Sequence, residues 1–214
     1  MSMASNRPFK IEIFGKSAHA TLPHSGVDAL AMANRVYDST QHMLAREMDP
    51  FAQWVCSIGT MKAGKAYNII ADYAEMEGTI RTYHSDVDEY IIKRIEDIAK
   101  SVTENAGGSA SVTSDMEMYP LYNDLQISEC VIAAAEKVVG KENIVEMTIK
   151  ISSEDFSHYL TKKPGAFFRL GTKNAAKGIV GLPHNNNFQL DEDALPLGVK
   201  VFVQFVIDNM NGLS

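Results

Sequence analysis

Pro8-Phe9-Lys10-Ile11-Glu12-Ile13-Phe14-Gly15 is the stretch that decides the fold of the first half of the chain. Large apolar residues at positions 9, 11 and 13 alternate with charged residues at positions 10 and 12. Because successive side chains of a strand point to opposite faces, this alternation predicts a strand with one buried and one solvated face.

The segments after this strand predict helix, strand, strand, helix and strand. They are a helix to about residue 47, strands over about 53–63 and 72–83, a helix from about residue 85 and a strand over about 109–118. Ser25 with Asp28, and Ser85 with Asp88, form S-x-x-D patterns that are typical of helix starts. Gly107-Gly108 predicts the end of the second helix, since glycine accepts the left-handed conformation found there.

The predicted order is therefore β-α-β-β-α-β. Two helices on one face of a four-stranded antiparallel sheet, a ferredoxin-like sandwich, is the economical packing for this order. The other face would be polar, and an uncovered edge strand invites pairing with a second copy. We expect this module to dimerise.

After Tyr119-Pro120 the pattern changes to α/β material of about 95 residues. It predicts helices over about 125–139 and 191–210, a β-like piece over 144–149 and a buried strand over 166–171. Ser153 is a candidate cap of a short helix. The predicted strands are too few to close a sheet, so we expect this region to be part of a larger α/β domain whose first half precedes residue 1.

The bulk composition narrows the class of protein. The chain has 214 residues and a formal charge of −7, and this charge argues against nucleic acid as a partner because phosphate binding needs a basic surface. No apolar run approaches the roughly 20 residues that span a bilayer, and the N-terminus has no signal-peptide pattern. The isolated cysteines, Cys56 and Cys130, suggest a reducing compartment. We expect a cytoplasmic protein that contacts neither nucleic acid nor membrane.

Two loops contain candidate chemical groups. His184 lies in Gly181-Leu182-Pro183-His184-Asn185-Asn186-Asn187-Phe188, and His19 lies in the loop that follows the first strand. A loop imidazole held between packed elements is positioned like a metal ligand or an acid–base group. The alternative for each is a solvated surface histidine.

Six motifs, taken in order, resemble a known family. They are Gly15-Lys16-Ser17-Ala18-His19-Ala20 with Pro23-His24; Tyr67-Asn68-Ile69-Ile70-Ala71-Asp72; Gly78-Thr79-Ile80-Arg81-Thr82; Ser153-Glu154-Asp155-Phe156; Pro164-Gly165; and Pro183-His184-Asn185 followed by Phe188. Each motif is weak alone, but together they resemble the dinuclear-zinc amidohydrolase and exopeptidase family of aminoacylases, carboxypeptidases and hippurate hydrolases. The branch with indoleacetyl-amino-acid hydrolases is the most similar.

The resemblance implies a domain organisation. In that family a ferredoxin-like lid, which forms a homodimer, interrupts the catalytic domain. Residues 8–118 would be the lid, and residues 119–214 would be the C-terminal part of the α/β catalytic domain.

The resemblance also implies roles for four residues. His19 falls on the lid histidine that reaches across the dimer to the substrate carbonyl, and Asn68 and Arg81 fall on the residues that hold the carboxylate side of the substrate. His184 falls on the last metal ligand. These residue types suit the chemistry, because amide hydrolysis needs a metal-activated water, stabilisation of the oxyanion and a planar fork for the carboxylate. From the residues alone, an ion pair of Arg81 with Glu75 or Glu77 is the preferred alternative.

Two departures loosen turns without removing a functional group: Ala71 and Asn186 stand where the family often has proline. A larger departure is that the family's other metal ligands and its general base precede the lid. The resemblance implies two divalent ions, zinc or manganese, in the complete enzyme, whereas a catalytic zinc normally needs three protein ligands. We therefore expect a fragment of a metal-dependent hydrolase of N-acyl amino acids or dipeptide-like substrates. This fragment would be inactive alone, because it contains one metal ligand.

Two alternatives remain open at this point. The chain could be a non-catalytic dimerisation or small-molecule-binding module, whose stability would not depend on metal and whose ligand binding would survive His184→Ala. The C-terminal half could also be structurally incomplete in isolation, in which case early proteolysis after Pro120 is expected.

Overall fold

The computed structural model describes residues 2–147 and 151–210. The described residues form two compact units, one of residues 2–121 with 151–158 and one of residues 122–147 with 159–210. The segment 151–158, which we grouped with the C-terminal part, clusters with the first unit.

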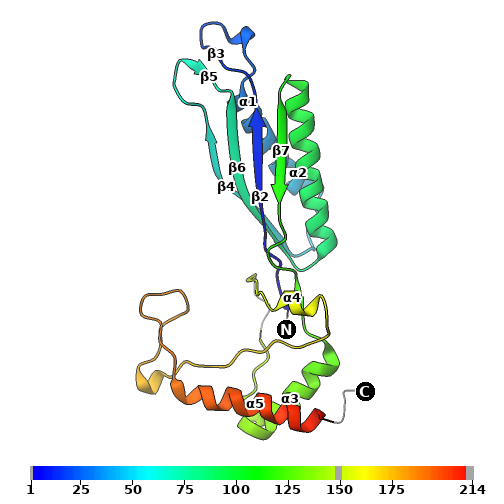
Figure 1. Ribbon diagram of the computed structural model, residues 1–214, viewed down its shortest axis with the longest axis vertical. Coiled ribbons are helices and arrows are strands. Elements are labelled where there is room, and N and C mark those ends of the chain that lie inside the picture. The colour runs from blue at the N-terminus through cyan, green and yellow to red at the C-terminus, as the bar shows by residue number, and fades with distance from the viewer. Residues whose placement is uncertain (1, 148–150, 211–214) are drawn as a thin grey trace. The chain divides into compact units, whose positions relative to one another are not determined.

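The first unit contains a four-stranded antiparallel sheet in the order β4-β6-β2-β7. Its strands are β2 (Arg7–Phe14), β4 (Trp54–Ala63), β6 (Tyr73–Thr82) and β7 (Ser109–Ser114). The helices α1 (Ala29–Arg46) and α2 (Ser85–Asn105) connect β2 to β4 and β6 to β7 (Figure 1). The predicted mixed α/β order with an antiparallel sheet is confirmed.

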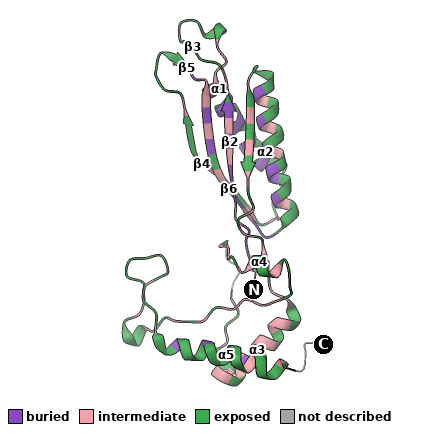
Figure 2. Cartoon of the chain, viewed as in Figure 1, coloured by how far each residue is buried: buried purple, intermediate pink, exposed green. Residues whose placement is uncertain are grey.

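The core of this unit lies between the sheet and both helices. Phe9, Ile11 and Ile13 of β2 are at most 3% exposed, as their alternation predicts. They pack in one cluster with apolar residues of β6, α1 and α2, among them Met76, Ile80, Met32, Val36, Ile91 and Ile95. Because every second residue of β2 joins this cluster, both helices cover the same face of the sheet (Figure 2). Burial of each large side chain contributes about 1.5–3 kcal/mol.

The opposite face of the sheet has a network of charged side chains. Lys10 Nζ lies 3.1 Å from carboxylate oxygens of both Glu12 and Glu75, and Lys62 Nζ lies 3.0 Å from Glu75. The Tyr73 hydroxyl hydrogen-bonds with the same two carboxylates, at 2.8 and 3.0 Å. Hydrogen bonds from Lys62, Lys10 and Tyr73 lower the pKa of Glu75 to about 2. The polar face that the sequence predicts is thus present.

Neither S-x-x-D pattern starts its helix in the predicted way. Asp28 is itself the N-cap of α1, where its carboxylate accepts hydrogen bonds from the Leu30 and Ala31 amides at 3.0 and 3.3 Å. Asp88 of α2 is fully buried instead of capping the helix. It accepts a hydrogen bond of 2.7 Å from the Ser5 hydroxyl and lies 3.3 Å from Arg7 Nη1.

The last strand of the sheet is shorter than predicted. β7 ends at Ser114, because the backbone of Met118 pairs with Asn6 in an isolated bridge instead of continuing along β2. Nearby, β1 (Ser2–Met3) and β8 (Leu121–Tyr122) form a separate two-stranded sheet.

The second unit is built mainly from two helices, α3 (Leu125–Val139) and α5 (Leu195–Asn209). Asp124 caps α3 by accepting from the Ile127 amide at 2.9 Å, and Gly140 ends it with a φ of 81°. The 3-10 turns are η2 (Lys141–Asn143), η3 (Ala175–Lys177) and η4 (Glu192–Ala194). The short helix α4 (Ser157–Leu160) begins four residues after Ser153, so Ser153 does not cap it.

The predicted strand over 166–171 is wrong. The Asn123 side chain accepts from the Phe167 amide and donates to the Phe167 carbonyl, at 2.9 and 2.8 Å. An amide side chain therefore satisfies the backbone groups that a neighbouring strand would otherwise pair. Residues 144–147 form no strand, and the rest of the predicted β-like piece lies outside the described residues.

Within the two described ranges, none of the helices combines the length and the apolar character needed to cross a membrane.

Candidate functional site

His19 and Asn68 lie together at one end of the first unit. The two-residue strand β3 (Ala18–His19) pairs with β5 (Ile69–Ile70), which places His19 opposite Ile69. The Ala20 amide also donates to the Asn68 carbonyl at 3.0 Å. Figure 1 shows β3 and β5 side by side beyond the ends of β4, β6 and β2. The pairing of these two-residue strands thus brings together two segments that are about 50 residues apart in the sequence.

The contacts of His19 fix which ring nitrogen is free. The Thr21 amide donates to His19 Nδ1 at 3.3 Å, and the Thr21 hydroxyl lies 2.7 Å from the same nitrogen. Because Nδ1 accepts a hydrogen bond, a neutral ring has its proton on Nε2. The exposed side chain therefore presents an N–H donor, which suits a carbonyl or oxyanion partner.

Arg81 lies at the opposite end of the same sheet. It is the ninth residue of β6, and Tyr73 at the start of that strand adjoins the β3–β5 end. At about 3.3 Å per residue, Tyr73 and Arg81 are separated by about 26 Å. One copy of the first unit therefore brings His19 and Asn68 together and keeps Arg81 away from both.

The half-buried Arg81 side chain has a neutral partner. Its Nη1 donates to the Ser153 hydroxyl oxygen at 3.2 Å, and it forms no ion pair with any residue that the structure describes. The alternative ion pairs with its own strand are not formed in this part of the chain, because Glu75 binds Lys10 and Lys62. The sequence placed Ser153 in a family motif and made it a candidate helix cap, but it did not predict the contact with Arg81.

His184 lies at the tip of an exposed loop. Within residues 2–147 and 151–210 it is the single non-glycine residue with positive φ, at 67°. This backbone conformation is uncommon for residues with a side chain, and it persists only where the surrounding structure holds it in place. The Asn185 amide donates to the Leu182 carbonyl at 3.3 Å, and a Cβ on Gly181 would lie 2.3 Å from the Asn187 carbonyl oxygen. The turn that presents His184 is therefore narrow.

An ionic cluster closes the base of this loop, which we name the histidine loop (residues 178–190). Lys177 Nζ lies 2.7 Å from Asp191 and 2.5 Å from Asp193, and Asn174 Nδ2 donates to Asp191 at 2.6 Å. The hydrogen bond from Lys177 is the main cause that lowers the pKa of the Asp191 carboxyl. The acidic segment ahead of α5 thus anchors the loop, a role that the sequence pattern alone does not reveal.

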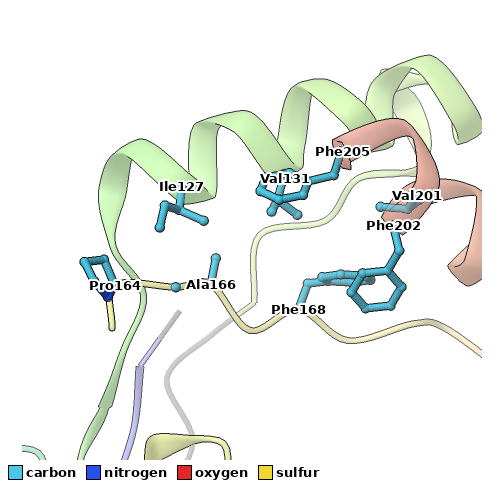
Figure 3. A pocket seen from close by; sticks show the side chains of 9 residues that line it. Ile127, Val131, Pro164, Ala166, Phe168, Val201, Phe202 and Phe205 are labelled. Atoms are coloured by element: carbon cyan, nitrogen blue, oxygen red, sulfur yellow. The ribbon is translucent and has the colours of Figure 1, made fainter. Parts of the chain in front are cut away.

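The second unit also has an apolar cavity of about 280 Å³ between α3, α5 and residues 164–168 (Figure 3). Its lining is Ile127, Val131, Pro164, Gly165, Ala166, Phe168, Val201, Phe202 and Phe205. The Phe168 and Phe202 rings lie 5.3 Å apart. Because no charged or hydrogen-bonding side chain lines it, this cavity has no groups for catalysis.

The described residues do not form a complete metal site. Among them there is no group of three or more His, Cys, Asp or Glu side chains that could hold an ion. The exposed imidazole of His184 fits the role of a single ligand. Cysteine chemistry is not indicated at Cys56, because burial raises the pKa of its thiol to about 12.

The sequence is similar to those of known proteins. Residues 6–107 match the family described as the peptidase dimerisation domain. A thermostable carboxypeptidase from Saccharolobus solfataricus is 33% identical over 92% of this chain and 49% of its own length. An IAA-amino acid hydrolase from Arabidopsis thaliana is 32% identical over 93% of this chain and 46% of its own length.

Solved structures give the same result. A putative aminohydrolase from methicillin-resistant Staphylococcus aureus superposes with a TM-score of 0.78 at 25% identity, over 96% of this chain and 52% of that one. A dinuclear metal binding peptidase of the M20 family from Bacillus subtilis has a TM-score of 0.74 at 26% identity, over 96% and 50%. The chain spans about half the length of the curated relatives it matches.

Proposed function

Because the chain belongs to the M20 family of peptidases and amidohydrolases, we propose that it is part of a metal-dependent amidohydrolase. The complete enzyme hydrolyses the amide bond of N-acyl amino acids or dipeptide-like substrates. Residues 8–118 are its lid and residues 119–214 are the C-terminal portion of its catalytic domain. The sheet order of the lid supports the ferredoxin-like description. The observation that carries the proposal is the joint position of His19 and Asn68 at one end of the sheet.

The separation of the site residues along β6 supports a homodimer. Tyr73, which adjoins the end of the sheet where His19 and Asn68 lie, stands about 26 Å from Arg81 along β6, and this separation is longer than an N-acyl amino acid. A substrate held by all three must therefore contact His19 and Asn68 of one protomer and Arg81 of the other. The edge strands β4 and β7, and the helices beside them, are the surfaces available for this pairing.

His19 is the group that steadies the developing negative charge on the substrate carbonyl oxygen. Its Nδ1 is occupied by Thr21, so the remaining nitrogen donates. A single preorganised donor of this kind contributes roughly 10²–10³ in rate in other hydrolases. Asn68 and Arg81 hold the carboxylate side of the substrate, and Arg81 does so through its planar fork.

His184 is one ligand of a site for two divalent ions, zinc or manganese. When bound, such ions supply an activated water and polarise the carbonyl. The narrow turn and the ionic cluster at the base of the histidine loop hold the imidazole outward. The other ligands and the general base come from outside the described residues.

Two observations support the proposal that this chain does not turn over substrate alone. One histidine cannot replace the three protein ligands of a catalytic zinc. The helix α5 also exposes apolar side chains, with Val199, Val206 and Ile207 57–63% exposed (Figure 2). An apolar surface of this kind indicates a missing packing partner. The two free cysteines support a cytoplasmic location.

Metal content per chain after gentle dialysis, measured with hydrolysis of N-acetyl amino acids on the same sample, tests the incompleteness. We expect little metal and no turnover, and two tight metals with turnover would reject it. Light scattering at micromolar concentration should give a dimer, and a monomer would reject the shared site.

The amidohydrolase proposal itself is tested on protein expressed with any coding sequence that adjoins these 214 residues. We expect two metals per protomer and hydrolysis that His184→Ala abolishes. Metal binding and hydrolysis that survive His184→Ala would reject the assignment of this ligand.

A further inference from the structure

The two-stranded pair β3–β5 has an inner and an outer face. Ala18 and Ile70 are directly opposed in this pair. Both point toward Gly26, because a Cβ on that glycine would lie 2.9 Å from Ala18 Cβ and 3.2 Å from Ile70 Cγ2. Successive residues of a strand point to opposite faces. His19 and Ile69, the other opposed residues, therefore share the outer face.

Ile69 is the apolar neighbour of the imidazole on that face. Directly opposed residues of an antiparallel pair have Cβ atoms about 4.5–5.5 Å apart, and Ile69 remains 46% exposed. Its position makes an apolar surface available next to the hydrogen-bond donor of His19.

The turns beside β3 and β5 add two exposed apolar side chains, Leu22 and Tyr67. One turn is closed by the Leu22 amide, which donates to the His19 carbonyl at 2.8 Å. The other is closed by the Ile69 amide, which donates to the Ala66 carbonyl at 3.3 Å. Single exposed apolar residues are ordinary on a protein surface, but several in the turns beside one donor indicate a contact surface.

A donor with an apolar neighbour suits a carbonyl group whose substituent is apolar. Under the proposed function, His19 donates to the substrate carbonyl oxygen, and Asn68 and Arg81 hold the carboxylate side. The acyl chain is the remaining substituent of that carbonyl, and it is within reach of a side chain whose Cβ lies about 5 Å from that of the histidine. Apolar contact there excludes water, which strengthens the hydrogen bond to the developing negative charge.

We propose that Ile69 contacts the acyl group of the substrate and sets a preference for apolar acyl chains longer than acetyl. This inference rests on the proposed function, which leaves the acyl group open. Each CH2 group that is covered contributes about fourfold in binding. An acetyl group has a single methyl beyond the carbonyl and therefore uses little of this surface.

The ratio of kcat/KM for N-hexanoyl-L-leucine to that for N-acetyl-L-leucine tests this contact. It is measured on metal-loaded protein expressed with any coding sequence that adjoins these 214 residues. With two of the added CH2 groups covered, the wild type should prefer the hexanoyl substrate about fifteenfold. Ile69→Thr keeps the β-branched shape and Ile69→Ala shortens the side chain, and each should lower this ratio about fourfold or more. Ile69→Leu should keep the preference.

Ile70→Val is the matched control on the inner face and should leave the ratio unchanged. An unchanged ratio in Ile69→Thr and Ile69→Ala would reject the inference and leave the proposed function standing, as would equal falls in these variants and in Ile70→Val. Faster hydrolysis of N-succinyl-L-leucine than of the hexanoyl substrate by the wild type would reject an apolar acyl site. If the wild type hydrolyses none of these substrates, the proposed function and the inference both fail.

Discussion

Replacing Arg7 by methionine should destabilise the first unit strongly and in a way that depends on pH. Arg7 Nη1 lies 3.3 Å from Asp88, whose side chain is fully buried, and 2.7 Å from the exposed Glu89. Methionine keeps most of the apolar stem and removes the charge. Asp88 would then retain the Ser5 hydroxyl as its hydrogen-bond donor.

The magnitude follows from the two ways in which Asp88 can respond. Leaving one partner of a buried ion pair uncompensated costs about 3–5 kcal/mol. Protonation of the Asp88 carboxyl avoids the cost of an unpaired charge. For a carboxyl with an ordinary pKa near 3.9, taking up this proton costs about 4 kcal/mol at pH 7 but only about 1.5 kcal/mol at pH 5. The loss in the free energy of unfolding should therefore be about 3–4 kcal/mol at pH 7 and about 1.5 kcal/mol at pH 5.

The direction of the pH dependence has a physical reason. Burial already raises the pKa of the Asp88 carboxyl, despite its bonds with Ser5 and Arg7, and removal of Arg7 raises it further. A group whose pKa is higher in the folded than in the unfolded state contributes stability below the unfolded pKa. That contribution is lost as the pH rises through the folded pKa. The variant should thus lose stability between about pH 4 and pH 7.

Urea unfolding at pH 5 and pH 7 measures both numbers. Trp54 is the single tryptophan of the chain and lies in β4, so its fluorescence reports on the first unit. Arg94→Met is the matched control, because it breaks a pair with Glu47 in which both side chains are about one-third exposed, and its effect should be small and similar at both pH values. Equal destabilisation by Arg7→Met at the two pH values would refute the reasoning. Adding Asp88→Asn to Arg7→Met should recover stability at pH 7.

Three further predictions concern other parts of the fold. Lys177→Met should speed amide hydrogen exchange throughout the histidine loop, and Lys173→Met, an exposed lysine next to the same segment, should not; equal rates in the two variants would contradict the anchoring role. Gly78→Ala should lower the free energy of unfolding by about 1–3 kcal/mol, because its Cβ would lie 2.4 Å from the phenylalanine ring that faces it on β2. The pKa of Glu75 is lowered, first by its hydrogen bond with Lys62, and this contributes stability that is lost as the pH falls from about 4.5 through about 2. Glu75→Gln should therefore reduce the loss of stability at acid pH, measured by urea unfolding. An acid dependence equal to that of the wild type would reject the network.

The sheet could be predicted because its signal is local. The alternation in β2 depends on which side of one strand is buried, and each residue shows this by its own polarity. The S-x-x-D patterns failed because the role of Asp88 depends on Ser5 and Arg7, more than 80 residues earlier in the chain. A capping pattern contains no information about such distant partners.

The apolar run over 166–171 shows a second limit of sequence patterns. Periodicity cannot distinguish a buried strand from a buried loop, and here the Asn123 side chain decides the matter by bonding both backbone groups of Phe167. Prediction of the candidate site from the sequence was limited in the same way. The roles of His19, Asn68 and Arg81 came from a family resemblance, and two-residue strands such as β3 are too short to have any pattern.

Arg81 and His184, two residues of the proposed site, depart from the pairing and the backbone geometry found in other parts of the fold. In the network around Glu75, for example, the charged groups form ion pairs. Arg81 has a neutral partner, and His184 holds a backbone conformation that costs about 1–3 kcal/mol. Local rules are expected to fail where a sequence is selected for binding. Under the proposed function, these are two positions at which a ligand would supply interactions that the described residues do not.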